Sequence, residues 1–369
     1  MRLKTAVIII LSLIATVSEA QQKRTFKEKL VAFLDSSNVQ NTDPNYIGLP
    51  DRPWRIIASN NTSQLNMKME SHLYDEVNGG TGFDFLLQVK PPVGNAVGLW
   101  GGYRGWGLGY SVSVTGNKGI NMSFNISTPA NGVNVRAHRF NYGQPYIAMT
   151  NIISKGERRD DVVIEIDNTS LDEPMEIESF VIDGYWIFNQ RHFSIAAAYD
   201  QSTRQLRSAG SLIAGLMFYY QKFDMSQKHN FILSELFGGT GKMKTYQGSL
   251  GLGYTYNFVP AHNWTLNFVS MPVLTLLNKV KIYNYELNLP ETPTVDPVPI
   301  DDLSWELKSS KTNNGRVRVN LATRVAVSYW HKRWFFSLIG QGHHFVTRYE
   351  NTELKMTDWE LKASVGRTL

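Results

Sequence analysis

The side chains with the clearest chemical potential in this sequence are basic residues that recur within one stretch. Between residues 315 and 330, arginines occupy alternate positions to valines, so they share one side of any extended backbone. Such a row could line a path for anions, or it could form ion pairs with carboxylates on neighbouring segments, such as Glu70 and Asp84. The candidate residues lining this wall are Arg316, Arg318, Arg324, Arg136, Lys362 and Glu360.

Other motifs that carry chemistry are incomplete in this chain. Segment 239–242 (G-T-G-K) is followed by Met243, where a phosphate-binding loop needs a hydroxyl group. His343 and His344 are adjacent, so on a strand they point to opposite faces and cannot share a metal ion. Ser249 lies in a pattern one residue short of a nucleophile elbow, and we interpret it as a small polar lumen residue. We therefore predict no enzymatic activity, no metal and no cofactor.

The arginine stretch itself predicts a β-strand with a different medium on each face. Val317, Val319, Val325 and Val327 occupy one side, with the two-residue period of a strand. The run exceeds the roughly 5 to 6 residues of an ordinary strand and covers the roughly 9 to 11 residues that cross a bilayer. A membrane barrel would place these valines in lipid, whereas a soluble sandwich or lipocalin-like barrel would enclose them.

Repetition of alternating runs along the chain favours the membrane barrel. The runs start near residue 65 and include a glycine-rich run at 97–114, read as one strand. Their connections alternate in length, as short periplasmic turns and long external loops do in outer-membrane barrels. The expected periplasmic joints are 90–96, 128–132, 189–206, 259–263 and 331–333, and the expected external loops include 141–174, 221–244 and 279–314. We therefore predict an all-β fold, a single antiparallel transmembrane β-barrel of about 12 strands.

The N-terminus predicts export. Residues 1–20 combine Arg2 and Lys4 with an apolar run and a small-residue cleavage site, as a signal peptide does. Residues 21–53 form the expected periplasmic N-terminal segment, and residues 54–369 form the expected outer-membrane barrel. The chain has no cysteine, and no later segment has the roughly 18 apolar residues of a membrane helix. We therefore predict that the protein resides in the outer membrane.

Several segments resemble an uncharacterised Bacteroidales-type outer-membrane β-barrel family, a domain of unknown function. They are Tyr185–Asn189, Phe193–Ser202, Gln205–Ser211 and Gly251–Asn257, with Trp264 and Pro272 after them. The resemblance extends from about Tyr46 to the C-terminus. It implies a signal-bearing outer-membrane barrel and brings no established activity. The chain departs from the family pattern at Ile195, where a proline is expected, and at Leu369, where an aromatic residue is expected.

One periplasmic joint, 189–206, is too long for a simple turn. We predict that it folds back into the lumen and is locked there, its arginines pairing with Asp183, Asp200 or Glu178. A ligand-binding role for the joint is the alternative. The candidate lock residues are Arg204, Gln205, Arg207 and Ser208.

These observations predict an envelope protein that is a structural barrel or a passive channel for small solutes. We favour an ion-paired wall over an anion-selective pore, because side chains can largely fill a lumen of this size. The alternative functions are a barrel-embedded enzyme acting on envelope lipid and a surface-binding protein that uses its long external loops. The expected partners are outer-membrane lipid and the barrel-assembly machinery. The net charge of +5 is spread along the chain, so nucleic acid is not an expected partner.

Overall fold

The structure, a computed structural model, describes most of the chain from residue 42 onward. The described residues are 28, 29, 32, 42–75, 81–115, 119–127, 131–154, 157–159, 163–165, 171–288, 299, 302–315, 317–349 and 351–369. The chain divides into two compact units, residues 1–39 and 40–369, and the description below concerns the second. The predicted signal peptide lies outside the described residues, as does most of the predicted periplasmic segment 21–53.

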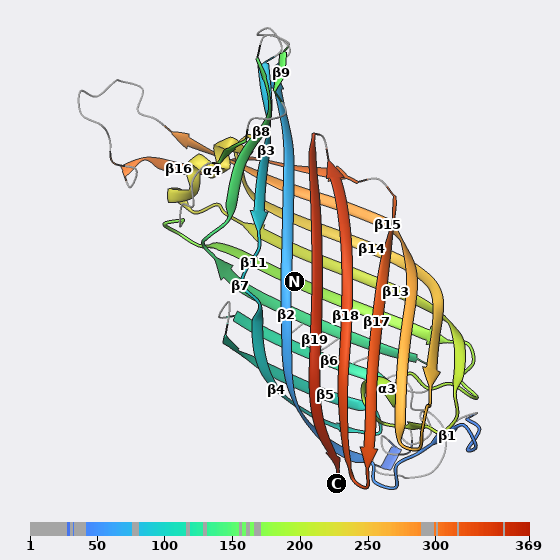
Figure 1. The fold of residues 1–369 in the computed structure, drawn as a ribbon. Helices are drawn as coiled ribbons and strands as arrows, with labels where there is room; N and C mark the ends of the chain where they lie inside the picture. The colour runs from blue at the N-terminus through green and yellow to red at the C-terminus, as the bar shows by residue number, and fades with distance from the viewer. Residues whose placement is uncertain are drawn as a thin grey trace. The chain divides into compact units, whose positions relative to one another are not determined.

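Twelve long strands of the second unit form a closed antiparallel barrel (Figure 1). Each strand pairs with the next in the ring, and the ring closes because β19 pairs with β2 and β2 pairs with β4. The strands, in ring order, are β2 (Trp54–Asp75), β4 (Gly94–Tyr103), β5 (Trp106–Thr115), β6 (Gly119–Ser127), β7 (Asn131–Tyr142), β11 (Met175–Ile187), β13 (Ala209–Asp224), β14 (Thr240–Phe258), β15 (Trp264–Asn288), β17 (Arg318–His331), β18 (Trp334–Tyr349) and β19 (Thr352–Thr368). The predicted fold class, an antiparallel outer-membrane β-barrel of about 12 strands, is confirmed.

The two ends of the barrel differ as expected for an outer-membrane protein. At the end that carries the C-terminus, three of the connections are short. They are the turns at 104–105 and 332–333 and the connection 259–263. The longer joint 188–208 lies at the same end and holds α3 (Ala196–Tyr199) and β12 (Arg204–Gln205), which pairs with β1 (Ile47–Gly48). Because short connections are periplasmic in such barrels, we assign this end to the periplasm.

The opposite, external end extends beyond the ring. β3 (Thr81–Val89) pairs with the upper part of β2 and with β8 (Tyr146–Ser154), which in turn pairs with β9 (Glu157–Arg159) and β10 (Ile164–Glu165). The other elements at this end are η1 (Lys228–Asn230), α4 (Phe231–Leu236) and β16 (Ser304–Asn314), which pairs with the upper part of β15. No helix among the described residues has the length and apolar character to cross a membrane.

The glycine-rich run 97–114 is a hairpin, so its interpretation as one strand was wrong. Arg104 and Gly105 form the turn between β4 and β5, with φ of 51° and 95°. Positive φ at both central residues is typical of the tight turns that join antiparallel strands. The expected periplasmic joint at 90–96 was therefore also wrong. This segment links β3, which pairs with the external part of β2, to β4, which pairs with the periplasmic part of the same strand. Trp100 consequently points inward and is buried.

The arginine stretch has the orientation that a membrane barrel requires. On β17, the side chains of Val319 and Val325 are 71% and 50% exposed on the outer wall. Ala322 and Ala326, on the other face, are buried in the barrel. Exposed leucine, phenylalanine, tyrosine and tryptophan side chains continue this outer surface over the neighbouring strands. An apolar outer wall of this kind is stable only against hydrocarbon, which excludes the soluble sandwich.

A charge placed on the lipid face tests this orientation. Val325→Arg should reduce the free energy of folding into phosphatidylcholine vesicles by about 2–4 kcal/mol, the cost of a cation near the bilayer midplane. The measurement is a urea titration read from the heat-modifiable electrophoretic mobility of the folded barrel. The matched control is Val163→Arg, because Val163 is 54% exposed in the external region between β9 and β10. Equal effects of the two substitutions would contradict the assignment of the outer wall to lipid.

Candidate functional site

The barrel interior contains an ion pair that joins opposite walls. Arg324 on β17 donates a hydrogen bond from Nη2 to Oδ2 of Asp183 on β11, at 2.6 Å. The two strands are separated by β13, β14 and β15 along the ring. Asn134 donates a second hydrogen bond to the same carboxylate oxygen, at 2.9 Å. Both charged side chains are largely buried, at 12% and 6% exposed, so this pair braces the lumen.

A second ion pair braces the lumen from another direction. Nη1 of Arg136 on β7 lies 3.2 Å from Oε2 of Glu360 on β19. β7 and β19 are separated by four strands of the ring, so this contact also crosses the interior. Gln341 donates a hydrogen bond to the same carboxylate oxygen at 2.6 Å. The structure therefore pairs two of the predicted lumen residues with each other.

For the other predicted wall residues, the strand register gives the position. Arg318 begins β17 opposite Thr275, and Lys362 lies on the inner face of β19, two residues beyond Glu360. Arg316 lies outside the described residues. The two other carboxylates considered as lumen partners are on the outer wall instead, and their contacts are there: Glu70 with Lys68 and Lys355, and Asp84 with His72.

The long periplasmic joint fills the lower part of the lumen. The three alanines of α3 are fully buried, which places this short helix inside the barrel. Tyr199 donates a hydrogen bond from its hydroxyl to Oδ1 of Asn267 at 2.9 Å, and Ser328 donates one to the carbonyl oxygen of Ala197 at 3.2 Å. These contacts tie the joint to β15 and β17. We call the segment Asn189–Ser208 the plug.

Gln205 is the centre of the plug's hydrogen bonds. Its Nε2 donates to the carbonyl oxygens of His192, Arg207 and Tyr46, at 2.6, 2.9 and 3.3 Å. Its Oε1 accepts from Nδ2 of Asn257 on β14 at 2.9 Å, and from the backbone of Ser194 at 3.0 Å. One buried amide thus links residues of the joint to one another, to the N-terminal lead-in and to the barrel wall.

The remaining lock residues lie at the rim of the barrel. The guanidinium of Arg204 stacks on the ring of Trp330 at 4.1 Å and donates to the carbonyl oxygen of Lys332 at 3.1 Å. Arg207 lies over the ring of Tyr46 at 5.7 Å, and Ser208 accepts a hydrogen bond from the backbone of Val259 at 2.9 Å.

The carboxylates expected to pair with these arginines have other cationic partners. Asp183 pairs with Arg324, and Glu178 lies 3.5 Å from the ammonium group of Lys222. Asp200 lies 3.9 Å from the fully buried guanidinium of Arg55. The expected ion pairs of Arg204 and Arg207 were therefore wrong, because both arginines use aromatic rings near the rim.

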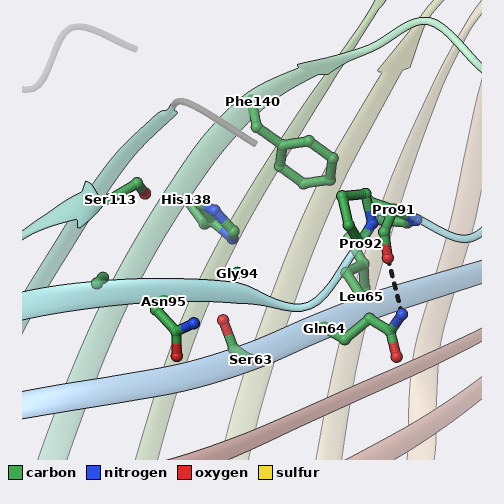
Figure 2. Close-up of a pocket in the computed structure, with 11 residues that line it drawn as sticks. Ser63, Gln64, Leu65, Pro91, Pro92, Gly94, Asn95, Ser113, His138 and Phe140 are labelled. Atoms are coloured by element: carbon green, nitrogen blue, oxygen red, sulfur yellow. Dashed lines mark hydrogen bonds between the residues drawn. The ribbon is translucent and has the colours of Figure 1, made fainter. Parts of the chain in front are cut away.

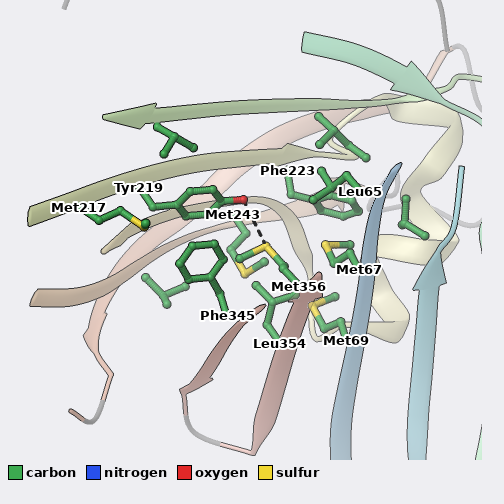
Figure 3. Close-up of a cluster of buried hydrophobic side chains, with 14 of the residues drawn as sticks. Leu65, Met67, Met69, Met217, Tyr219, Phe223, Met243, Phe345, Leu354 and Met356 are labelled. Carbon is green, nitrogen blue, oxygen red and sulfur yellow. Dashed lines mark hydrogen bonds between the residues drawn. The ribbon is translucent and has the colours of Figure 1, made fainter. Parts of the chain in front are cut away.

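The upper lumen is apolar and rich in methionine. Figure 3 shows side chains from opposite walls converging there, among them Met69, Met217 and Met356, with Phe345 beside Tyr219. The hydroxyl of Tyr219 lies 3.9 Å from the sulfur of Met356, and the rings of Tyr219 and Phe345 stack at 4.5 Å. Flexible methionine side chains fill irregular space well, which suits a narrow interior. The apolar face of β2 points inward here, opposite to the pattern at its periplasmic end.

The cavities left between these layers are small. The cavity in Figure 2, near Pro91 and His138, has a volume of about 30 Å³. Two others, beside Arg324 and beside Arg136, measure about 20 and 40 Å³. Each is of the order of one or a few water molecules. A larger cavity of about 450 Å³ lies at the periplasmic rim, where Arg52, Arg204, Lys332 and Arg333 contribute to its lining.

Sequence patterns missed several residues of the braced interior. Asp183 was expected to pair with an arginine of the joint, but it lies in a run that is apolar on both sides, and its pairing with Arg324 was not predicted. Arg55 lies at the start of β2, before the first clear alternating run. Gln341 and Asn134 lie directly opposite Glu360 and Asp183 on the adjacent strands, and the sequence does not indicate this register. Among the described residues, no cluster of histidine, aspartate and glutamate could hold a metal ion.

Comparison with known proteins found one family model and several similar solved structures. The model of a domain of unknown function, DUF4421, matches residues 41–366. No curated protein matches the chain. Solved structures that are similar include the outer membrane protease OmpT from Escherichia coli, with 10% identity over 85% of this chain and 97% of that chain and a TM-score of 0.41. The Pseudomonas putida toluene transporter TodX has 7% identity over 90% and 94% of the two chains and a TM-score of 0.26.

Removing one partner of the Arg324–Asp183 pair should destabilise the barrel far more than removing both. Arg324→Met or Asp183→Leu alone leaves a buried charge unpaired, which costs about 3–5 kcal/mol. The double variant should recover most of this loss. Urea unfolding followed by tryptophan fluorescence gives the coupling energy. The exposed pair Lys308–Glu286 is the control and should couple by at most about 1 kcal/mol. Additive losses at Arg324 and Asp183 would contradict the brace.

The plug predicts a pH dependence through Asp200. Burial raises the pKa of this carboxyl group to about 6, so the folded protein holds a proton that the unfolded chain has released. Its stabilising contribution is present at low pH and is lost as the pH rises through about 6. Between pH 4 and 7, the unfolding free energy of wild type relative to Asp200→Asn should fall by about 1–3 kcal/mol. Asp172→Asn, at an exposed position, should show no such trend.

Proposed function

Because the chain belongs to the family of the domain of unknown function DUF4421, whose description assigns no activity, we propose a function from the barrel itself. The proposed function is that of a sealed outer-membrane barrel with a structural role in the envelope. In this proposal the barrel spans the outer membrane and presents its external extensions at the cell surface. Its interior serves to hold the wall together instead of conducting solutes.

The filled lumen is the observation that supports this proposal. The plug occupies the periplasmic part, two ion pairs cross the middle, and methionine and aromatic side chains fill the external part. Each layer joins strands from opposite walls. The cavities that the described residues leave between the layers at these three places are about 20 to 40 Å³, of the order of one or a few water molecules, which supports a closed interior.

Passive passage of small solutes is the second candidate, and it requires the plug to move. The plug is connected to β11 at one end and to β13 at the other, so it could move toward the periplasm while both ends stay attached to the barrel. Much of its attachment consists of side-chain hydrogen bonds, centred on Gln205 and Asn257. Displacing it would still leave the two ion pairs across the lumen. The sealed barrel therefore agrees better with the geometry than a channel does.

Surface binding and enzymatic activity have weaker support. The external extension built by β3, β8 and β16 offers surface for a partner, as the long loops predicted. On that extension, Nδ1 of His72 lies 2.5 Å from Oδ1 of Asp84, and Asn151 donates to the same carboxylate. Such a pair could orient an imidazole base, but catalysis also needs a nucleophile and a bound substrate converging on it. We therefore propose no enzymatic activity.

Planar-bilayer recording separates the sealed barrel from the passive channel. Purified wild-type protein should give no steady conductance. The Gln205→Ala/Asn257→Ala variant, which loses the centre of the plug's hydrogen bonds, should also give no steady conductance, because the two ion pairs still cross the lumen. Adding Arg324→Ala removes one of these pairs as well, and any openings of that triple variant should prefer cations, because a lumen cation is lost. Heat-modifiable mobility verifies that each variant is folded. Steady conductance of the wild type would overturn the sealed barrel in favour of the channel.

A further inference from the structure

A row of lysines crosses the outer wall at the external edge of the apolar belt. The strand register places Lys222 on β13 opposite Lys244 on β14, and Lys244 opposite Lys281 on β15. All three point outward, because their neighbours Phe223, Thr245 and Val280 are buried. Like charges directly opposite each other destabilise a sheet, so such a row needs compensating negative charge.

The protein itself supplies this compensation on one side only. Lys222 lies within 2.7–3.7 Å of three carboxylates, those of Glu176, Glu178 and Asp224. Within the described part of the chain, no carboxylate lies within ion-pair distance of Lys244 or Lys281. Both ammonium groups instead lie over the ring of Tyr283, at 5.3 and 4.8 Å. Tyr283 therefore gathers two cations that lack a protein anion.

The surface below this pair is built for acyl chains. Leu250 and Leu252 continue the outward side of β14 toward the periplasm and are more than half exposed. Leu274 and Leu276 are exposed on the outward side of β15. Tyr246 pairs with Lys279 and packs on Tyr220 at a ring distance of 5.2 Å, between the lysines and the leucines. Tyrosines at this level mark the membrane interface of a barrel. The lysine pair thus lies at headgroup height.

We propose that Lys244 and Lys281, with Tyr283 between them, bind the phosphate group of a lipid in the external leaflet. The phosphate would lie between the two ammonium groups, and the acyl chains would lie along the leucines beneath them. Charge complementarity and position select this ligand, because a phosphate is the anion that a bilayer presents at this height. The proposal does not depend on whether the lumen conducts.

An equivalent pair elsewhere on the barrel shows why this one differs. Lys68 on β2 is directly opposite Lys355 on β19, also on the outer wall toward the external end. Glu70 lies 2.6 Å from Lys68 and 3.6 Å from Lys355, and Glu353 lies 3.2 Å from Lys355. That pair is neutralised within the protein and offers little to a lipid phosphate. It provides a matched control.

The experiment measures lipid binding to the detergent-solubilised barrel by native mass spectrometry, with phosphatidic acid and phosphatidylcholine as probes. Wild type should prefer phosphatidic acid. Lys244→Gln/Lys281→Gln should bind it roughly 30-fold more weakly, from about 1 kcal/mol per lysine. Lys244→Arg/Lys281→Arg should retain binding, and Lys68→Gln/Lys355→Gln should match wild type. Heat-modifiable mobility checks that every variant is folded.

Three outcomes would overturn the proposal. Unchanged binding by Lys244→Gln/Lys281→Gln would remove these residues from the site. An equal loss in Lys68→Gln/Lys355→Gln would show a general effect of surface charge. Displacement of phosphatidic acid by inorganic phosphate at equal concentration would show a site for free phosphate instead of a lipid, since the acyl chains would then contribute nothing.

Discussion

Contact between opposite walls is the constraint on which the rest of this barrel depends. Arg324 meets Asp183 at 2.6 Å, and Arg136 meets Glu360 at 3.2 Å, although both pairs come from strands far apart along the ring. Such contacts require a narrow interior, since each one uses two side chains to cross it. Four charged groups removed from bulk water are tolerable only when paired and hydrogen-bonded, and Asn134 and Gln341 each donate a further hydrogen bond to one of the two carboxylates. The interior is therefore fixed by polar geometry as well as by packing.

The outer wall and the plug are consistent with this narrow interior. Along β17, lipid-facing valines alternate with small inward residues such as Ala322 and Ala326, which leave room for α3 and for the guanidinium of Arg324. On the upper part of β2 the apolar side turns inward, because this part of the strand lies beyond the apolar belt and packs a methionine-rich cluster. The apolar side chains of β2 therefore face inward in its external part, opposite to the pattern in its periplasmic part.

The charged side chains of the outer wall are arranged differently from those of the lumen. Inside, the pairs Arg324–Asp183 and Arg136–Glu360 each fix the distance between two strands across the lumen. Outside, lysines, arginines and carboxylates gather toward the external end, where Lys68 and Lys355 are balanced by Glu70 and Glu353. The pair Lys244 and Lys281 departs from that balance, and this departure supports the assignment of a lipid phosphate to it.

The sequence by itself determined the class of fold, because a two-residue period with apolar outer positions is a local property that each strand carries alone. It also placed the plug, whose length does not suit a turn, and it named Arg324, Arg136, Glu360 and Gln205 as candidates. The tertiary structure alone decided their partners, since the residues that face each other across a lumen depend on the ring order and register of strands distant in sequence. It also decided that Glu70 and Asp84 face outward and that Arg104 and Gly105 form a turn, because both follow from backbone geometry that alternation does not encode.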